Sequence, residues 1–164
     1  MIGARIAATA AAAAALALGA RAAAAQGRGS LALQPSGRVD VLASRIRAVQ
    51  AGVGLDARAG RYVRLGLVGA AGESWYAGRS GLSARIEAVG RFVLDPEFAT
   101  RWAPYITGGI GARYDRVGSW RGVLSAGIGL EGPNANGVVP FVEVGYGGGL
   151  RLGIGLRRAL TGSR

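Results

Sequence analysis

The sequence predicts an all-β chain: an antiparallel up-and-down β-barrel of about eight strands, preceded by an N-terminal signal helix. Three observations support this prediction. Residues 81–95 alternate between apolar and polar side chains, the pattern recurs to the end of the chain, and turn signals separate the repeats. A period of two is typical of a strand, because successive side chains point to opposite faces. Residues 81–95 are also long for an ordinary strand, which has about 5–6 residues.

The first residues have the pattern of a targeting signal. Residues 6–20 are an uncharged apolar run that follows a single arginine, and a run of alanines ends at Ala25. The apolar run is shorter than the roughly 20 residues that a membrane-spanning helix needs. Small residues before a cleavage point are typical of a secretory signal peptide. We therefore expect residues 1–25 to be a signal peptide and residues 26–164 to be the β-barrel domain.

Seven strands can be assigned by alternation. In chain order they are residues 49–58, 62–71, 81–95, 103–115, 122–131, 138–147 and 150–157. Residues 72–79 are expected to connect two of them, with Trp75 and Tyr76 in the loop. Residues 133–137 carry the proline and Asn-Gly signals of a hairpin, and such short links imply an antiparallel meander.

An eighth strand has room within residues 31–47, but its phase is unclear. Arg45 and Arg47 fall out of phase with the polar residues that follow. A bulge near Ala48, or a strand that ends and restarts, would explain the shift.

The composition of the 164 residues argues against several kinds of chemistry. The chain has no cysteine and no histidine, so it lacks disulfides, thiolates and the commonest general base and metal ligand. Its formal charge is +11, but the arginines are spread singly along the strands and interleaved with acids. A nucleic-acid binder would gather them in a patch, so we expect no nucleic-acid partner. Membrane lipid is the expected partner of a basic rim, and no protein partner can be identified.

The polar wall of the predicted strands combines glycines with charged residues. Glycine is depleted in strands that face water, but it leaves space for long side chains inside a narrow barrel. An eight-stranded barrel is just filled by its side chains, which predicts an ion-paired plug and no open pore. An arginine-lined path for anions is the functional alternative. The expected interior residues are Arg64, Arg85, Glu87, Arg91, Arg113, Asp115, Glu131, Glu143, Arg151 and Arg157.

The aromatic residues gather near two rims. One rim collects Trp75, Tyr76, Tyr114, Trp120 and Tyr146, and the other collects Tyr62, Phe92, Phe98, Trp102, Tyr105 and Phe141. Amphipathic rings prefer the level of the lipid head groups, so two such girdles indicate a membrane barrel whose apolar wall faces outward. The residues expected at the membrane interface are Tyr62, Trp75, Tyr76, Trp102, Tyr114, Trp120 and Tyr146.

No catalytic or cofactor site is predicted. Residues 127–132 match G-x-G-x-x-G, but the match lies within a strand and runs into Pro133, whereas a dinucleotide site needs a strand followed by a helix. Ser80, Ser83 and Ser125 have no histidine to activate them. We therefore expect no catalytic residue, no cofactor and no metal ligand.

On residues 122–158 and the hairpins before them, the chain resembles the small outer-membrane β-barrel proteins of Gram-negative bacteria. The resemblance covers the chain from about Val49 onward and rests on architecture. It implies location in the cell outer membrane and a structural or interaction role without enzymatic activity. The alternative is a soluble periplasmic β-barrel that binds a small apolar ligand inside an apolar wall. Members of the family usually end on an aromatic residue that the insertion machinery reads, whereas residues 157–164 contain none.

Overall fold

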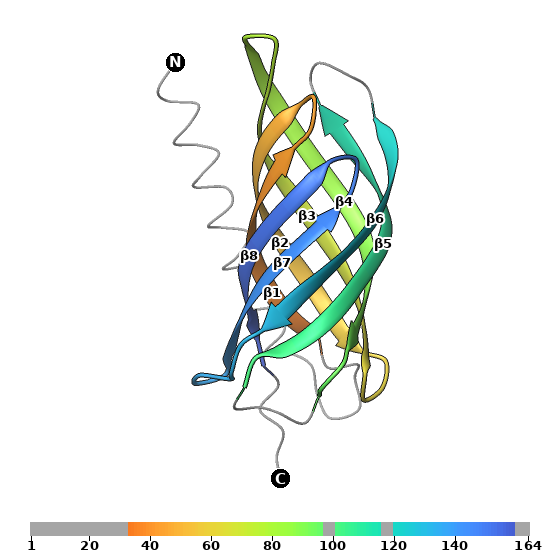
Figure 1. Ribbon diagram of the computed structural model, residues 1–164, viewed down its shortest axis with the longest axis vertical. Coiled ribbons are helices and arrows are strands. Elements are labelled where there is room, and N and C mark those ends of the chain that lie inside the picture. The colour runs from red at the N-terminus through yellow and green to blue at the C-terminus, as the bar shows by residue number, and fades with distance from the viewer. Residues whose placement is uncertain (1–32, 97–100, 116–119, 160–164) are drawn as a thin grey trace.

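Eight antiparallel strands close into a barrel in the computed structural model, which describes residues 33–96, 101–115 and 120–159 (Figure 1). The strands are β1 (Leu33–Ala43), β2 (Arg47–Arg58), β3 (Val63–Tyr76), β4 (Arg79–Val93), β5 (Ala103–Asp115), β6 (Arg121–Glu131), β7 (Val138–Tyr146) and β8 (Leu150–Arg158). Each strand pairs with its neighbours in sequence, and β8 pairs with β1. The predicted barrel is confirmed. The expected signal peptide lies outside the described residues.

The eighth strand is β1, and β2 begins after a tight turn. Ser44 shapes this turn, because its hydroxyl donates to the carbonyl of Ile46 at 2.7 Å and accepts the Ile46 N–H at 3.2 Å. β1 ends at Ala43 and β2 begins at Arg47 with no bulge near Ala48, and Arg47 is out of phase with the polar residues that follow because it faces outward at the strand end.

The segment 72–79 was wrongly predicted as a connection. β3 continues to Tyr76 and β4 starts at Arg79, so Trp75 and Tyr76 end a strand. The turn between them is only Ala77 and Gly78, with φ of 48° and 75°. Two positive φ values are what a two-residue hairpin turn requires. The prediction failed because Gly, Glu and Ser are weak strand formers, and their pairing with β4 overrides that local preference.

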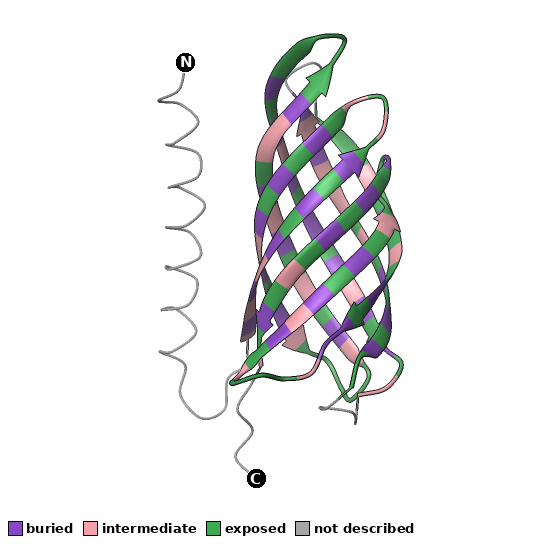
Figure 2. Cartoon of the chain, turned by 60° about the vertical axis from the view of Figure 1, so that its left-hand side comes forward, coloured by how far each residue is buried: buried purple, intermediate pink, exposed green. Residues whose placement is uncertain are grey.

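The apolar wall of the barrel faces outward. Buried and exposed residues alternate along every strand (Figure 2), and the exposed large side chains include Leu124 at 77%, Ile110 at 64% and Ile128 at 62%. In the described ranges, outward-facing charged residues occur only near strand ends: Arg47, Glu73 and Arg158. The alternative of an apolar ligand inside the barrel therefore loses its structural basis. No helix in the described ranges is long and apolar enough to cross a membrane.

Candidate functional site in the barrel interior

The barrel interior is lined by charged side chains in nearly equal numbers of each sign. All ten residues that the sequence assigned to the interior are buried. The structure adds Arg38, Asp40 and Asp56, which gives seven buried arginines and six buried acids in the described residues. Arg38 and Asp40 escaped sequence analysis because the phase of their strand was unclear. The interior is almost neutral, so the surplus positive charge of the chain lies elsewhere.

Six of these residues form a closed cycle of alternating charge at the centre of the barrel, here named the charge ring: Asp40, Arg38, Glu143, Arg151, Glu87 and Arg85. Arg38 contacts Asp40 at 2.7 Å and Glu143 at 3.1 Å. Arg151 contacts Glu143 at 2.6 Å and Glu87 at 2.9 Å. Arg85 closes the cycle to Glu87 at 3.3 Å and to Asp40 at 2.5 Å. Every guanidinium therefore lies between two carboxylates.

The charge ring joins strands that are distant in the sheet. Its members come from β1, β4, β7 and β8, and β4 lies on the opposite side of the barrel from β8. Ion pairs therefore cross the full width of the interior. The side chains of Asp40, Glu87 and Arg151 are almost inaccessible to solvent. A charge buried this deeply needs a partner, and here each one has two.

A second cluster lies toward the end of the barrel where β1 begins and β8 ends. Glu131 accepts hydrogen bonds from Arg64 and, at 2.8 Å, from Arg157. Arg157 also donates to Gln34 at 2.7 Å, and Arg91 pairs with Asp56. This cluster links β1 and β8 to β3 and β6 across the interior.

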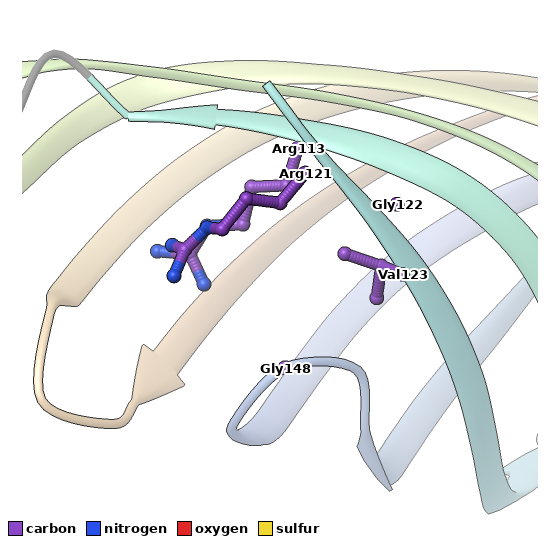
Figure 3. A pocket seen from close by; sticks show the side chains of 5 residues that line it. All are labelled: Arg113, Arg121, Gly122, Val123 and Gly148. Atoms are coloured by element: carbon purple, nitrogen blue, oxygen red, sulfur yellow. The ribbon is translucent and has the colours of Figure 1, made fainter. Parts of the chain in front are cut away.

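A third cluster lies at the opposite end and is centred on Asp115. Its carboxylate contacts Arg113 at 3.0 Å and Arg121 at 2.8 Å, and it accepts the hydroxyl of Ser83 at 2.8 Å. Ser83 in turn accepts a hydrogen bond from Gln50 at 2.8 Å. Figure 3 shows the side chains of Arg113 and Arg121 lying along each other at this end.

Three interior glycines face aromatic or charged side chains of the next strand. Gly129 is the register partner of Tyr105, Gly155 of Phe141 and Gly153 of Asp40. A Cβ added at Gly129 or Gly155 would overlap the facing ring, and one at Gly153 would lie 2.7 Å from Nη2 of Arg38. These glycines therefore give the interior room for its large side chains.

Two aromatics predicted to belong to the girdles point inward instead. Tyr105 and Phe141 are 1% and 6% exposed. The hydroxyl of Tyr105 donates to Oε2 of Glu143 at 3.0 Å, and the guanidinium of Arg38 lies 5.7 Å from the centre of the Phe141 ring. Proximity to a strand end does not determine whether a side chain points into the barrel or outward. The register of the strand determines it. Tyr105 also packs with Val93 and Ala103, so the interior includes a small apolar cluster that the sequence did not reveal.

The seven aromatics assigned to the membrane interface lie on the outside near the strand ends. Tyr62, Trp75, Tyr76, Trp102, Trp120 and Tyr146 are exposed, and Tyr114 is half-buried against Trp120 at 5.6 Å between ring centres. Phe92 is exposed too and stacks on Tyr62 at 5.9 Å. Phe98 lies outside the described residues.

The other sequence signals do not build a site. The G-x-G-x-x-G match begins within β6, where Gly127 and Gly129 face the interior, and no helix follows it. Ser83 is buried in the Asp115 cluster. In the ranges that the structure describes, no group of acids, histidines or cysteines could hold a metal ion.

No model of a known protein family matches the chain, and no curated protein matches it. Solved structures do. The N-terminal β-barrel domain of Pseudomonas aeruginosa OprF matches with a TM-score of 0.55 and 13% identity, over 76% of this chain and 96% of that domain. A de novo designed transmembrane β-barrel matches with a TM-score of 0.50 and 17% identity, over 81% of this chain and 97% of the design. The fold of this chain is therefore that of the small transmembrane β-barrels.

Proposed function

We propose that this protein is a small outer-membrane β-barrel of the kind found in Gram-negative bacteria, exported through the signal in residues 1–25. The observation that carries the proposal is the sidedness of the wall. Apolar side chains cover the outside between the two ends, and the paired charges lie inside. A soluble barrel would have the reverse arrangement, whereas a membrane barrel places its apolar band against lipid.

The exposed charges also fit a membrane. The exposed arginines lie at strand ends and in turns: Arg45, Arg47, Arg79 and Arg121 at one end, and Arg58, Arg61, Arg101 and Arg158 at the other. Each end therefore carries basic groups at the height where lipid phosphates lie, beside the exposed aromatics. This distribution favours membrane lipid as the partner and does not form the single patch that nucleic acid requires.

The role that we propose is structural or interactive, with a closed interior and no enzymatic activity. The charge ring spans the interior at its centre, and these ion pairs support an interior that is closed to ions. The turns 44–46, 77–78 and 147–149 at one end are short, so they offer little surface for a large soluble receptor. Ser83 is buried and donates to Asp115, but this carboxylate is already ion-paired with Arg113 and Arg121, and the chain has no histidine to activate a serine.

Two measurements test the proposal. Membranes from cells that express the full chain are washed with carbonate or urea, and the protein should stay in the pellet and migrate as a heat-modifiable band. Release into the soluble fraction would overturn the membrane assignment. Purified protein in a planar bilayer should give no steady conductance. Regular anion-selective conductance steps would contradict the ion-paired plug and support the arginine-lined path for anions.

A further inference from the structure

Among the described residues, the ladder between β6 and β7 is the shortest in the barrel. β6 and β7 share only the six register pairs from Ala126↔Tyr146 to Glu131↔Phe141, whereas β5 and β6 share eleven. Residues 121–125 of β6 therefore pair with β5 on one side and, among the described residues, with no strand on the other. The turn 147–149 between β7 and β8 lies below this free edge (Figures 1 and 3). We name the gap between residues 121–125 and this turn the β6 notch.

The β6 notch contains a cavity with a cationic wall. The cavity measures about 180 Å³ and is lined by Arg113, Arg121, Gly122, Val123 and Gly148 (Figure 3). Gly122 would meet no atom within 4 Å of an added Cβ, so its side of the notch is open. Arg113 and Arg121 line this cavity, and Gly122 and Gly148 contribute no side chain to its wall.

Asp115 leaves part of this positive charge uncompensated. It contacts both arginines, but Arg113 binds it only through Nε and Nη2. The side chain of Arg113 is almost fully buried beside Asp115. Arg121 is 54% exposed, and Asp115 is the acid that it contacts among the described residues. Two cations therefore share one anion at the lining of the cavity.

The surroundings of the β6 notch indicate the chemistry of its ligand. A guanidinium pair matches the geometry of a phosphate group, which accepts several charge-assisted hydrogen bonds. The free edge of residues 121–125 adds backbone N–H groups, which need a polar partner where they meet a membrane. Below them, Leu124 and Ile110 are among the most exposed apolar residues of the wall. Trp120 directly precedes β6, and its ring lies 5.6 Å from that of Tyr114 on β5.

We propose that the β6 notch binds the phosphate group of an anionic membrane lipid, held by Arg113 and Arg121, with an acyl chain along Leu124 and Ile110. The inference rests on the proposed membrane location and names the lipid class that the barrel prefers. A free phosphate ion offers the same chemistry without the chain, and the experiment separates the two.

The test uses Trp120 as the reporter of lipid contact. The full chain carrying W75F and W102F is inserted into phosphatidylcholine vesicles that contain either brominated phosphatidic acid or phosphatidylcholine with the same brominated chain. Brominated phosphatidic acid should quench Trp120 fluorescence more strongly at equal mole fraction. R121Q keeps the Arg113–Asp115 pair and should reduce the apparent preference for phosphatidic acid about three- to tenfold. The matched control is R79Q, an exposed arginine at the same end of the barrel but outside the β6 notch.

Each outcome decides a separate point. Equal quenching by both lipids, or equal effects of R121Q and R79Q, overturns the inference while the barrel remains in the membrane. Displacement of phosphatidic acid by added inorganic phosphate at millimolar concentration would show a site for phosphate alone and overturn the lipid assignment. V123C provides a cysteine in a chain that has none, and disulfide-linked dimers of V123C would assign the free edge to a second copy. Failure to give a heat-modifiable, vesicle-bound band overturns the proposed function and this inference together.

Discussion

Arg151 of β8 donates from Nη1 to Oε2 of Glu87 on β4 at 2.9 Å, although the two strands lie on opposite sides of the barrel. Both side chains are almost fully buried, and Glu87 also faces Arg85. Glu87 thus lies between two guanidiniums at the centre of the molecule, and each of these contacts a second carboxylate. Four predictions follow from this interior and from the wall around it.

Removing the charge of Glu87 should destabilise the barrel strongly. Glu87→Gln leaves Arg85 and Arg151 with less compensation in a site that water does not reach, which should lower the free energy of unfolding by about 3–5 kcal/mol. Urea unfolding of the protein in lipid vesicles measures the change. Glu73→Gln is the matched control, because Glu73 lies near the end of β3 on the outer face, and its effect should stay within about 0.5 kcal/mol. Similar values for both variants would contradict the role assigned to the charge ring.

Ile128→Arg tests which solvent the outer wall meets. Ile128 lies in the middle of β6, faces outward and is 62% exposed. An arginine at mid-depth in lipid should destabilise the barrel by about 2–4 kcal/mol, whereas Ala135→Arg in the turn before β7 should have almost no effect. The two variants are compared by the urea midpoint in vesicles. If both variants lower the free energy of unfolding by only a few tenths of a kcal/mol, Ile128 faces water and the membrane assignment fails.

Gly129→Ala tests the glycine lining of the interior. A Cβ at this position overlaps the ring of Tyr105, and a close-packed interior can relieve that overlap only by shifting. The expected loss is about 1–3 kcal/mol of unfolding free energy, measured by the same denaturation. Gly90→Ala on the outer face meets nothing closer than 3.8 Å and should not destabilise. In the double variant with Tyr105→Leu, the effect of Gly129→Ala should largely disappear, and a full effect there would refute the proposed overlap.

Tyr105→Phe distinguishes an interior tyrosine from one at the membrane interface. The substitution removes the hydrogen bond to Glu143 and should destabilise the barrel by about 1.5–3 kcal/mol, because the acceptor is charged and buried. Tyr62→Phe on the exposed rim provides the comparison and should be nearly neutral. If both substitutions have equally small effects on stability, Tyr105 does not lie in the interior but in the aromatic girdle, as its sequence position suggested.

Much of this fold could be predicted from the sequence because the outer wall is so regular. Leu124, Ile128 and Leu130 repeat at every second or fourth position, and that period alone specifies a strand and its two faces. The same signal placed Glu87, Glu143 and Arg151 inside. It could not pair them, because partners from β4, β7 and β8 meet only through the register of the closed sheet.

Other features depend on tertiary context that no local pattern carries. Arg38 and Asp40 lie on a strand that contains Pro35 and Gly37, which weaken its alternation, yet they form part of the charge ring. The positions of Tyr105 and Phe141 near strand ends predicted girdle residues, whereas the register of the sheet places both side chains inside. The β6 notch exists because β6 extends beyond the end of β7. The sequence of either strand alone does not show how far the two are offset.

The charge ring also bears on the order in which the molecule can assemble. Its members extend from Arg38 in the first strand to Arg151 in the last, so no partial sheet of consecutive strands contains the complete cycle. Before the last strand docks, Glu87 and Glu143 lack Arg151 and have only Arg85 and Arg38 as partners, and an incompletely compensated charge disfavours burial. Intermediates therefore keep their inner face hydrated, and dehydration of the interior coincides with closure. The ring makes completion of the barrel an all-or-none event that depends on the arrival of its C-terminal strand.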